Sequence, residues 1–247
     1  MRVILNGAAG RMGREVINAI NSDFTGVELM ACVDVAKPEQ PFPCYTKLSE
    51  VCEKADVLID FSHHSATRDV LDFAAKTQIP VIIATTGQTD EEREMIKEAS
   101  KKVAIFFAGN MSIGIALLVE LVKSAVKVFP EADVEIIETH HNQKLDVPSG
   151  TALMIANGIK AVREDASFLI GRHENGKRPQ GEIGIHSIRM GKIVGIHEVK
   201  ISTSSQTITL KHEAHNRGLF AEGALKAAAF MCGKVKGLYS LGDMFNK

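Results

Sequence analysis

The sequence predicts a doubly wound α/β domain with a parallel sheet, joined to a second α+β domain with a mixed or antiparallel sheet. Three observations predict it: short apolar strands that alternate with helical segments up to about residue 111, a glycine-rich turn after the first strand, and consecutive strand patterns after residue 180. Strands that are apolar throughout are typical of a parallel sheet covered on both faces, whereas consecutive strands with short turns favour antiparallel pairing.

Five strands and the helices between them are predicted for the first domain. The predicted strands are 2–6, 27–34, 55–61, 80–84 and 103–107. The predicted helices run through residues 12–20, 65–76 and 89–101. An amphipathic, Ala-rich helix over 221–232 is expected to pack back onto this domain, which we therefore predict to comprise residues 1–111 and 216–247.

The second domain is predicted over residues 112–215, for substrate binding and oligomerisation. Its expected helices are 112–128 and about 149–162, and its expected strands are 132–139, 184–190, 195–203 and 207–213. The last three strands are expected to pair antiparallel with one another. The stretch 166–180, rich in Gly, Arg and Lys, is predicted to be a long exposed loop.

Composition excludes several classes of protein. The 247 residues include 29 Lys and Arg against 30 Asp and Glu, so the charge of −1 argues against a nucleic-acid partner. The most apolar later window, 113–119, is far shorter than the roughly 20 residues that span a bilayer, which argues against a membrane partner. The four cysteines contain no CxxC pair and follow no signal peptide, so we expect reduced thiols in a cytoplasmic protein.

The glycine-rich turn predicts a dinucleotide site. Gly7, Gly10 and Gly13 form a GxxGxxG pattern that follows a strand and opens a helix, as in a Rossmann-like fold. Glycines permit the tight turn and the close approach of a pyrophosphate, and the N–H groups at the helix N-terminus favour its charge. The alternative is a turn that only reverses the chain. Asp34, 21 residues after Gly13, has the spacing of a carboxylate that bonds the cofactor ribose.

Asp34 also predicts which cofactor is used. A carboxylate at this place repels a 2′-phosphate, and the next basic residue is only Lys37. We therefore expect NADH to be preferred or NADH and NADPH both to be used. Arg11, within the turn, is a possible phosphate contact.

The stretch HHNQKLDVPSGT, from His140 to Thr151, predicts a catalytic and substrate site. Two adjacent histidines at a strand end and Lys144 supply charge and transferable protons, while Gly150 and Thr151, near a helix start, supply donors for a carboxylate. The alternative is a solvated loop with Ser149 as an N-cap. His186 and His197 are expected to be ordinary strand-face residues, and no metal site is predicted.

Several motifs together resemble the dihydrodipicolinate reductase family of bacterial lysine biosynthesis. They are GAAGRMG (7–13), DFS (60–62), ATTG (84–87), AGNMS (108–112), HHxxKxDxPSGTA (140–152) and GEIGIHSIRMG (181–191). The resemblance spans essentially the whole chain, and HHxxKxDxPSGTA is its most specific part. It implies reduction of 4-hydroxy-tetrahydrodipicolinate with NADH or NADPH, and a homo-oligomer, commonly a tetramer, paired through the sheet of the second domain.

The resemblance also implies residue roles. It places the cofactor on Gly7, Ala8, Ala9, Gly10, Arg11, Met12, Asp34, Phe61, Ala84, Thr85, Thr86, Ala108, Gly109, Asn110 and Met111. It makes His140 the general acid/base and Lys144 the proton donor. It makes His141, Ser149, Gly150, Thr151 and Arg217 substrate-binding residues. Family members commonly carry Gly at the position of Ala84 and often Phe at that of Met111, so we expect altered cofactor affinity here.

Two other readings remain open on the residues alone. The chain can be a different two-domain dehydrogenase, acting on an aspartate-derived semialdehyde or a sugar, or an NAD(H)-sensing regulator on the same fold. The first requires other substrate-side motifs, and the second usually carries a DNA-binding module, for which this chain has no spare residues.

Overall fold

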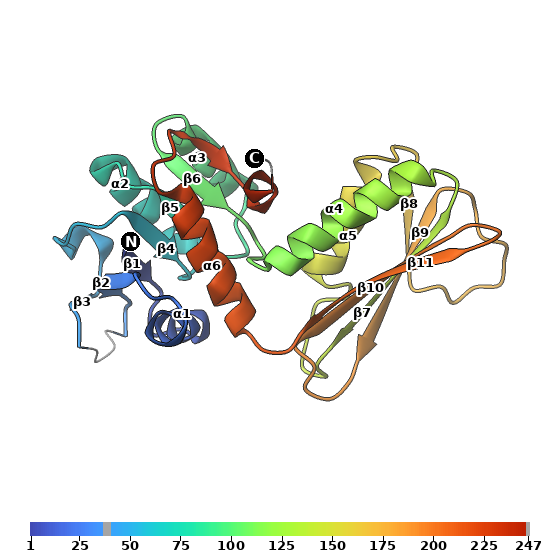
Figure 1. Ribbon diagram of the computed structural model, residues 1–247, viewed down its shortest axis with the longest axis horizontal. Helices are drawn as coiled ribbons and strands as arrows, with labels where there is room; N and C mark the ends of the chain where they lie inside the picture. The colour runs from blue at the N-terminus through green and yellow to red at the C-terminus, as the bar shows by residue number, and fades with distance from the viewer. Residues whose placement is uncertain (37–40, 246–247) are drawn as a thin grey trace. The chain divides into compact units, whose positions relative to one another are not determined.

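A computed structural model describes residues 1–36 and 41–245 (Figure 1). The chain divides into two compact units, one made of Met1–Ser112 together with the residues from Arg217 onward, the other of Ile113–Asn216. The predicted domain limits differ from these by one residue at each crossing.

The first unit is built on a seven-stranded sheet in which every adjacent pair is parallel. Its strands are β1 (Arg2–Asn6), β2 (Glu28–Val33), β3 (Cys44–Tyr45), β4 (Val57–Asp60), β5 (Val81–Ile83), β6 (Ala104–Phe107) and β12 (Gly237–Tyr239). The order is β12-β6-β5-β4-β1-β2-β3, so β2 and β3 are added on one side of β1 and the strands from β4 onward on the other. The predicted Rossmann-like fold is confirmed, whereas β3 and β12, only two and three residues long, were not predicted from the sequence.

Four helices cover the two faces of this sheet (Figure 1). They are α1 (Arg11–Ser22), α2 (Thr67–Thr77), α3 (Asp90–Ser100) and α6 (Gly218–Met231), with short 3-10 turns η1 (Leu48–Glu50), η2 (His64–Ala66) and η3 (Leu241–Met244). Helices α1 and α6 contact each other on one face, and α2 and α3 contact each other on the other. Phe230 of α6 makes edge contacts with Phe106 of β6 and Tyr239 of β12, so the segment after Arg217 is packed into this core.

The second unit contains the expected mixed sheet. Its strands are β7 (Asp133–His140), β8 (Ser167–Ile170), β9 (Glu182–Arg189), β10 (Gly195–Ser202) and β11 (Thr207–Ala214), in the order β11-β10-β7-β9-β8. Strand β10 pairs antiparallel with β11 and with β7, while β9 pairs parallel with β7 and with β8. The prediction that three consecutive strands pair with one another is therefore wrong for β9 and β10. Strand β7 lies between them and forms ladders on both its sides.

The prediction of a long exposed loop over 166–180 is also partly wrong, because β8 occupies its first part. Phe168 packs against the apolar core, and the strand pairs parallel with β9. The residues that follow are tied back by charge: Arg172 binds Glu182, and Arg178 binds Glu135 and Asp133. The Gly-, Arg- and Lys-rich residues after Ile170 led to the prediction of a loop, although Ser167–Ile170 form a strand that pairs with β9.

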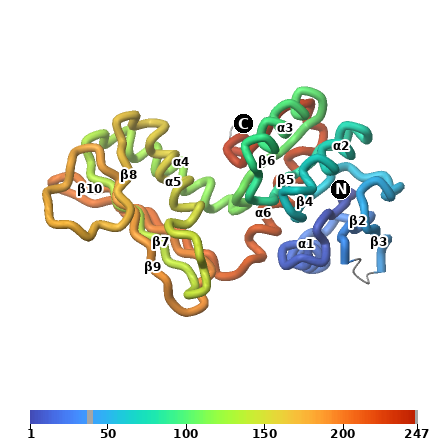
Figure 2. The backbone as a smooth tube through the Cα atoms, turned by 180° about the vertical axis from the view of Figure 1, so that it is seen from behind, coloured from blue at the N-terminus to red at the C-terminus, as the bar shows by residue number. Residues whose placement is uncertain are grey.

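Helices α4 (Ile113–Val128) and α5 (Gly150–Lys160) lie side by side on one face of this sheet (Figure 2). They bury alternate strand residues such as Val134, Ile136 and Val199. The opposite face carries Glu135 and His186, which are joined by a hydrogen bond of 2.7 Å. The helix side of the sheet is thus apolar except at the strand ends, where polar side chains gather.

Within the described residues, no helix has the length and apolar character needed to span a membrane.

Candidate functional site

The glycine turn between β1 and α1 is shaped by main-chain contacts. Gly7 has φ +83°, and a Cβ there would lie 2.5 Å from the carbonyl group of Phe61. A Cβ on Gly13 would lie 2.3 Å from the Gly7 oxygen. Gly10 is the extended N-cap of α1 and puts no side-chain cap on the first turn, whose N–H groups point to where an anion would sit. These residues therefore fit a dinucleotide pyrophosphate.

Asp34 follows β2 and reaches this turn. Its carboxylate accepts hydrogen bonds from the backbone N–H groups of Ala9 at 2.9 Å and Ala36 at 3.0 Å. The structure thus brings together the glycine turn and the acidic residue 21 positions beyond it. Lys37, the basic residue weighed for cofactor preference, lies outside the described residues.

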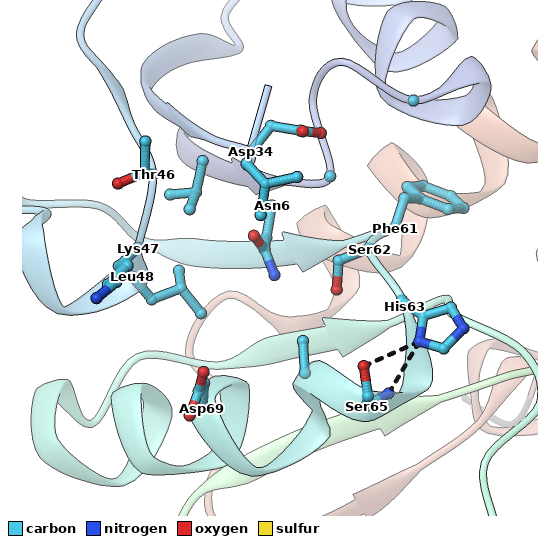
Figure 3. Close-up of a pocket in the computed structure, with 15 residues that line it drawn as sticks. Asn6, Asp34, Thr46, Lys47, Leu48, Phe61, Ser62, His63, Ser65 and Asp69 are labelled. Atoms are coloured by element: carbon cyan, nitrogen blue, oxygen red, sulfur yellow. Dashed lines mark hydrogen bonds between the residues drawn. The ribbon is translucent and has the colours of Figure 1, made fainter. Parts of the chain in front are cut away.

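A pocket of about 360 Å³ adjoins the turn and Asp34 (Figure 3). The strands β1, β2 and β4 bring Asn6, Asp34 and Phe61 to it at their carboxyl ends, where ligands of open α/β sheets bind. Thr46 and Lys47 also line it, and sequence reasoning missed both. They follow β3, and the register of Val33 with Tyr45 places them beside Asp34. Only a prediction of that two-residue strand would have found them.

A buried carboxylate, Asp60, holds the ends of three strands together. It accepts hydrogen bonds from Asn6 Nδ2 at 2.8 Å, Ser62 Oγ at 2.6 Å and Thr85 Oγ1 at 2.7 Å. Burial raises the pKa of Asp60 above its ordinary value, and these donors oppose that shift. The DFS motif therefore fixes the edge of the sheet along which the predicted cofactor residues lie.

The remaining predicted cofactor residues follow β5 and β6. Ala84 and Thr85 are buried and Thr86 is exposed, while Ala108 donates its backbone N–H to Ile83. The other residues of this set are Gly109, Asn110 and Met111. Met111 is 2% exposed, and its carbonyl approaches α6 so closely that a Cβ on Gly223 would lie 1.8 Å from the oxygen. The roles of these residues stay predictions.

In the second unit, His140 ends β7 in a network of buried polar groups. Its Nδ1 lies 2.5 Å from Glu138 Oε2, and Glu138 is fully buried. Arg189 of β9 donates to both carboxylate oxygens, Nη1 to Oε2 and Nη2 to Oε1, each at 2.8 Å. Burial alone would raise the pKa of Glu138. The hydrogen bonds from His140 and Arg189 outweigh burial and hold this pKa well below its usual range.

The same network reaches α5 through Ser149 and His197. The Ser149 hydroxyl accepts from Ala152 N–H at 3.1 Å as the N-cap of α5, and it lies 3.2 Å from His197 Nε2. The His197 ring meets the His140 ring edge-on, with centroids 5.2 Å apart. Burial lowers the pKa of His197 to about 3, with a further contribution from charge on His140. His197 is therefore a strand residue, as predicted, but it belongs to this cluster and not to a plain sheet face.

Lys144 lies on the loop between β7 and α5. Its Nζ is 2.7 Å from Asp146 Oδ1, and the Lys144 side chain is about one-fifth exposed at 21%. Partial burial raises the pKa of Asp146, but the hydrogen bonds from Lys144 and the Gly150 backbone lower it overall. His141 is half-buried, and its backbone N–H donates to Ile193. A cation and a helix N-terminus thus meet at one carboxylate, which is the chemistry predicted for binding an acidic substrate.

The structure brings most of the predicted substrate residues together. His140, His141, Lys144, Ser149 and Gly150 occupy one strand end, one loop and one helix start in the second unit, and Thr151 follows in α5. Arg217 caps α6 and belongs to the first unit. Sequence reasoning missed Glu138 and Arg189 as members of the cluster, although Glu138 lies two residues before His140 and Arg189 lies within the GEIGIHSIRMG motif.

Two family models match the chain. "Dihydrodipicolinate reductase, N-terminus" matches residues 1–111, and "Dihydrodipicolinate reductase, C-terminus" matches residues 114–245. The chain belongs to the dihydrodipicolinate reductase family. The resemblance predicted from the motifs is therefore confirmed, and the protein is an oxidoreductase whose first unit is the family's nucleotide-binding domain.

Relatives with curated names and a solved structure of the family match this chain over nearly its whole length. The chain is 45% identical to the 4-hydroxy-tetrahydrodipicolinate reductase of Caldanaerobacter subterraneus subsp. tengcongensis, covering 100% of this chain and 99% of the relative. It is 43% identical to that of Clostridium novyi, covering 98% and 97%. A dipicolinate-bound dihydrodipicolinate reductase from Paenisporosarcina sp. TG-14 superposes with a TM-score of 0.83 at 28% identity, covering 99% of each chain.

Proposed function

We propose that this protein reduces 4-hydroxy-tetrahydrodipicolinate to tetrahydrodipicolinate with NADH or NADPH, in the cytoplasmic diaminopimelate route to lysine. The observation that carries the proposal is the cluster in which His140, Lys144 and the N-terminus of α5 converge in a family member. The glycine turn and the pocket beside Asp34 support the use of a dinucleotide.

The second unit binds and protonates the substrate in this proposal. The substrate is a cyclic imine dicarboxylate that loses its 4-hydroxyl group as water, leaving a conjugated acceptor. Lys144 and the backbone donors of Gly150 and Thr151 hold a carboxylate, with His141 beside them. The positive groups also stabilise the negative charge that develops on the ring during reduction. The enamine left by hydride addition must take up a proton. His140 would donate it from Nε2, because its Nδ1 is engaged by Glu138.

The first unit binds the cofactor in this proposal. Gly7 to Met12 receive the pyrophosphate, and Asp34 receives the adenosine ribose, with Phe61 lining the pocket. The residues that follow β5 and β6 meet the nicotinamide. When bound, the dihydronicotinamide supplies the hydride that adds to ring C4. The carboxylate of Asp34 favours NADH, and Lys47 on the same pocket supports dual use.

Substrate-dependent oxidation of NADH tests the proposal. The substrate is supplied in the assay as the product of the synthase that precedes this reaction, and loss of NADH absorbance is followed. We expect turnover that depends on both the synthase and this protein. If the protein binds NADH but the substrate causes no oxidation of NADH or NADPH, the proposed reaction is contradicted.

We also propose a homo-oligomer, a tetramer by resemblance to the family, paired through the sheet of the second unit. Helices α4 and α5 cover one face of that sheet, and the opposite face, with Glu135 and His186, is the one available for pairing. Light scattering coupled to gel filtration gives the mass. A monomer at micromolar concentration would contradict this assembly.

A further inference from the structure

The buried carboxylate of Glu138 is held by donors from three elements. It receives His140 Nδ1 from its own strand, both terminal guanidinium nitrogens of Arg189 from β9, and the backbone N–H of Ser149 at 3.1 Å from the start of α5. A buried charge is costly unless it is paired and hydrogen-bonded. Four hydrogen bonds fill the roughly four acceptor sites of this carboxylate, so its buried charge is fully paired.

We propose that Glu138 and Arg189 form a positioning pair that fixes the tautomer of His140 and the loop that carries Lys144. The inference rests on the proposed function for its catalytic consequence, and the geometry of the pair stands independently of it. Neither residue is placed on substrate or cofactor, so both act through His140 and Lys144.

The tautomer follows from the hydrogen-bonding capacity of a carboxylate. An ionised carboxylate only accepts, so the His140 nitrogen 2.5 Å away must carry a hydrogen. Nε2 is then the only ring nitrogen that gains or loses a proton. It faces Gly195, where a Cβ would lie 3.0 Å from Nε2, so the glycine leaves this nitrogen uncrowded. Glu138 therefore directs proton transfer to a single atom.

Arg189 joins this dyad to the Lys144 loop. The nitrogen Nη2 that bonds Glu138 also donates to the backbone carbonyl of Asp146 at 2.8 Å. The carboxylate of Asp146 in turn pairs with Lys144. The planar guanidinium of Arg189 can donate to the Glu138 carboxylate and the Asp146 carbonyl at once. The ammonium of a lysine lacks this fixed arrangement of donors. One side chain thus sets the position of both predicted proton donors.

Charged and titratable groups from each neighbouring element determine how Glu138→Gln acts. His140 is faced by Glu138 on β7, Arg189 on β9 and His197 on β10, and Lys144 lies on the following loop. Glu138 is the anion that contacts the imidazole ring, so its neutralisation leaves positive neighbours. The limb of the pH–rate profile that reports proton donation is therefore expected to move to lower pH.

The test uses the purified full-length chain with Glu138→Gln, Glu138→Asp and Arg189→Lys. We expect Glu138→Gln to lower kcat on the order of a hundredfold, as for a lost general acid, with KM for NADH unchanged and the pH profile shifted. Glu138→Asp restores part of kcat. Arg189→Lys lowers kcat and raises KM for the dicarboxylate, because the Lys144 loop is released. The matched control is Glu213→Gln, an exposed Glu on the same sheet paired with Lys211.

Gly195→Ala keeps the inference testable if the Glu138 variants do not fold. It places a Cβ 3.0 Å from His140 Nε2, and we expect kcat to fall while the melting temperature changes little. Wild-type kcat and an unshifted pH profile in Glu138→Gln, or wild-type kcat in Gly195→Ala, would overturn the proposal.

An ¹⁵N-histidine spectrum separates this inference from the proposed function, because it requires no turnover. We expect the wild-type His140 signals to show a protonated Nδ1, with the signature altered in Glu138→Gln. A wild-type protein that shows this signature but reduces no substrate would refute the proposed function alone. A neutral His140 with its proton on Nε2 would refute the positioning pair.

Discussion

The glycine-turn pocket and the His140 cluster differ in what holds them. The pocket is shaped by backbone, since Gly7 and Gly13 approach main-chain atoms and Asp34 is bound by two backbone N–H groups. The cluster is held by side chains from strands far apart in sequence, with Arg189 51 residues from Glu138. We therefore expect the glycine-turn pocket to be disrupted by an added side chain. We expect the His140 cluster to be disrupted by the removal of a side chain.

The largest effect is expected from adding one methyl group to the turn. Gly13→Ala places a Cβ 2.3 Å from the Gly7 oxygen, and backbone there cannot yield as a flexible side chain does. We expect a loss of about 3 kcal/mol in the free energy of unfolding and loss of NADH binding. Urea denaturation and NADH fluorescence measure these. Gly176→Ala is the control, because nothing lies within 4 Å of its added Cβ. If Gly13→Ala is as stable as Gly176→Ala, the close approach of the backbone at Gly13 does not limit the stability of the turn.

Removing the imidazole tests the opposite dependence. His140→Ala is expected to lower kcat on the order of a hundredfold, as for a lost general acid, while NADH binding is retained. Steady-state kinetics with the synthase-coupled assay measures this. His173→Ala, which removes an exposed histidine from the segment between β8 and β9, is the control and should retain activity. Wild-type turnover by His140→Ala would show that His140 is not the proton donor.

Lys144→Ala is expected to give a smaller loss in each of two constants. Charge and proton are lost together, so kcat should fall and KM for the dicarboxylate should rise, each on the order of tenfold. The initial-rate dependence on substrate separates the two. Lys177→Ala removes an exposed lysine from the β8–β9 loop as the control. Unchanged KM would exclude Lys144 from carboxylate binding.

His197 makes the stability of the cluster depend on pH. Burial lowers its pKa from the ordinary value of 6.5 to about 3, so between these values the unfolded chain binds a proton that the native state does not. Stability from this group therefore falls as pH drops below about 6.5, by about 1.4 kcal/mol per pH unit at most. Urea denaturation at about pH 6 and about pH 5 should show a shallower dependence in His197→Phe than in the wild type. Parallel dependences in the two proteins would refute this role of His197.

The smallest effect concerns cofactor choice at the pocket. Lys47→Glu adds a negative charge beside Asp34, so we expect the kcat/KM for NADPH to fall several-fold relative to that for NADH. Lys76→Glu, in the last turn of α2, is the control. In the wild type, a hundredfold advantage for NADPH over NADH would contradict the preference predicted from Asp34.

The glycine-turn pocket and the His140 cluster also differ in how far the sequence predicted them. The glycine spacing and Asp34 were sufficient to predict a backbone site, because β1, β2 and β4 have clear apolar patterns and lie within the first sixty residues. Thr46 and Lys47 were missed because β3 is too short to show such a pattern. The strand end with His140 and Lys144 was predicted from one continuous motif. The partners Glu138, Arg189 and His197 were not, because strand order decides them and β7 lies between two strands that are consecutive in sequence.

The packing of α6 and β12 into the first unit has a consequence for synthesis on the ribosome. Phe106, fully buried, is translated more than a hundred residues before Phe230, the ring that packs against it. The inserted unit is complete once Asn216 has emerged, whereas the nucleotide unit still lacks an edge strand and a covering helix. The nascent chain therefore exposes an apolar surface throughout translation of the insert, and this surface is where chaperone protection is needed.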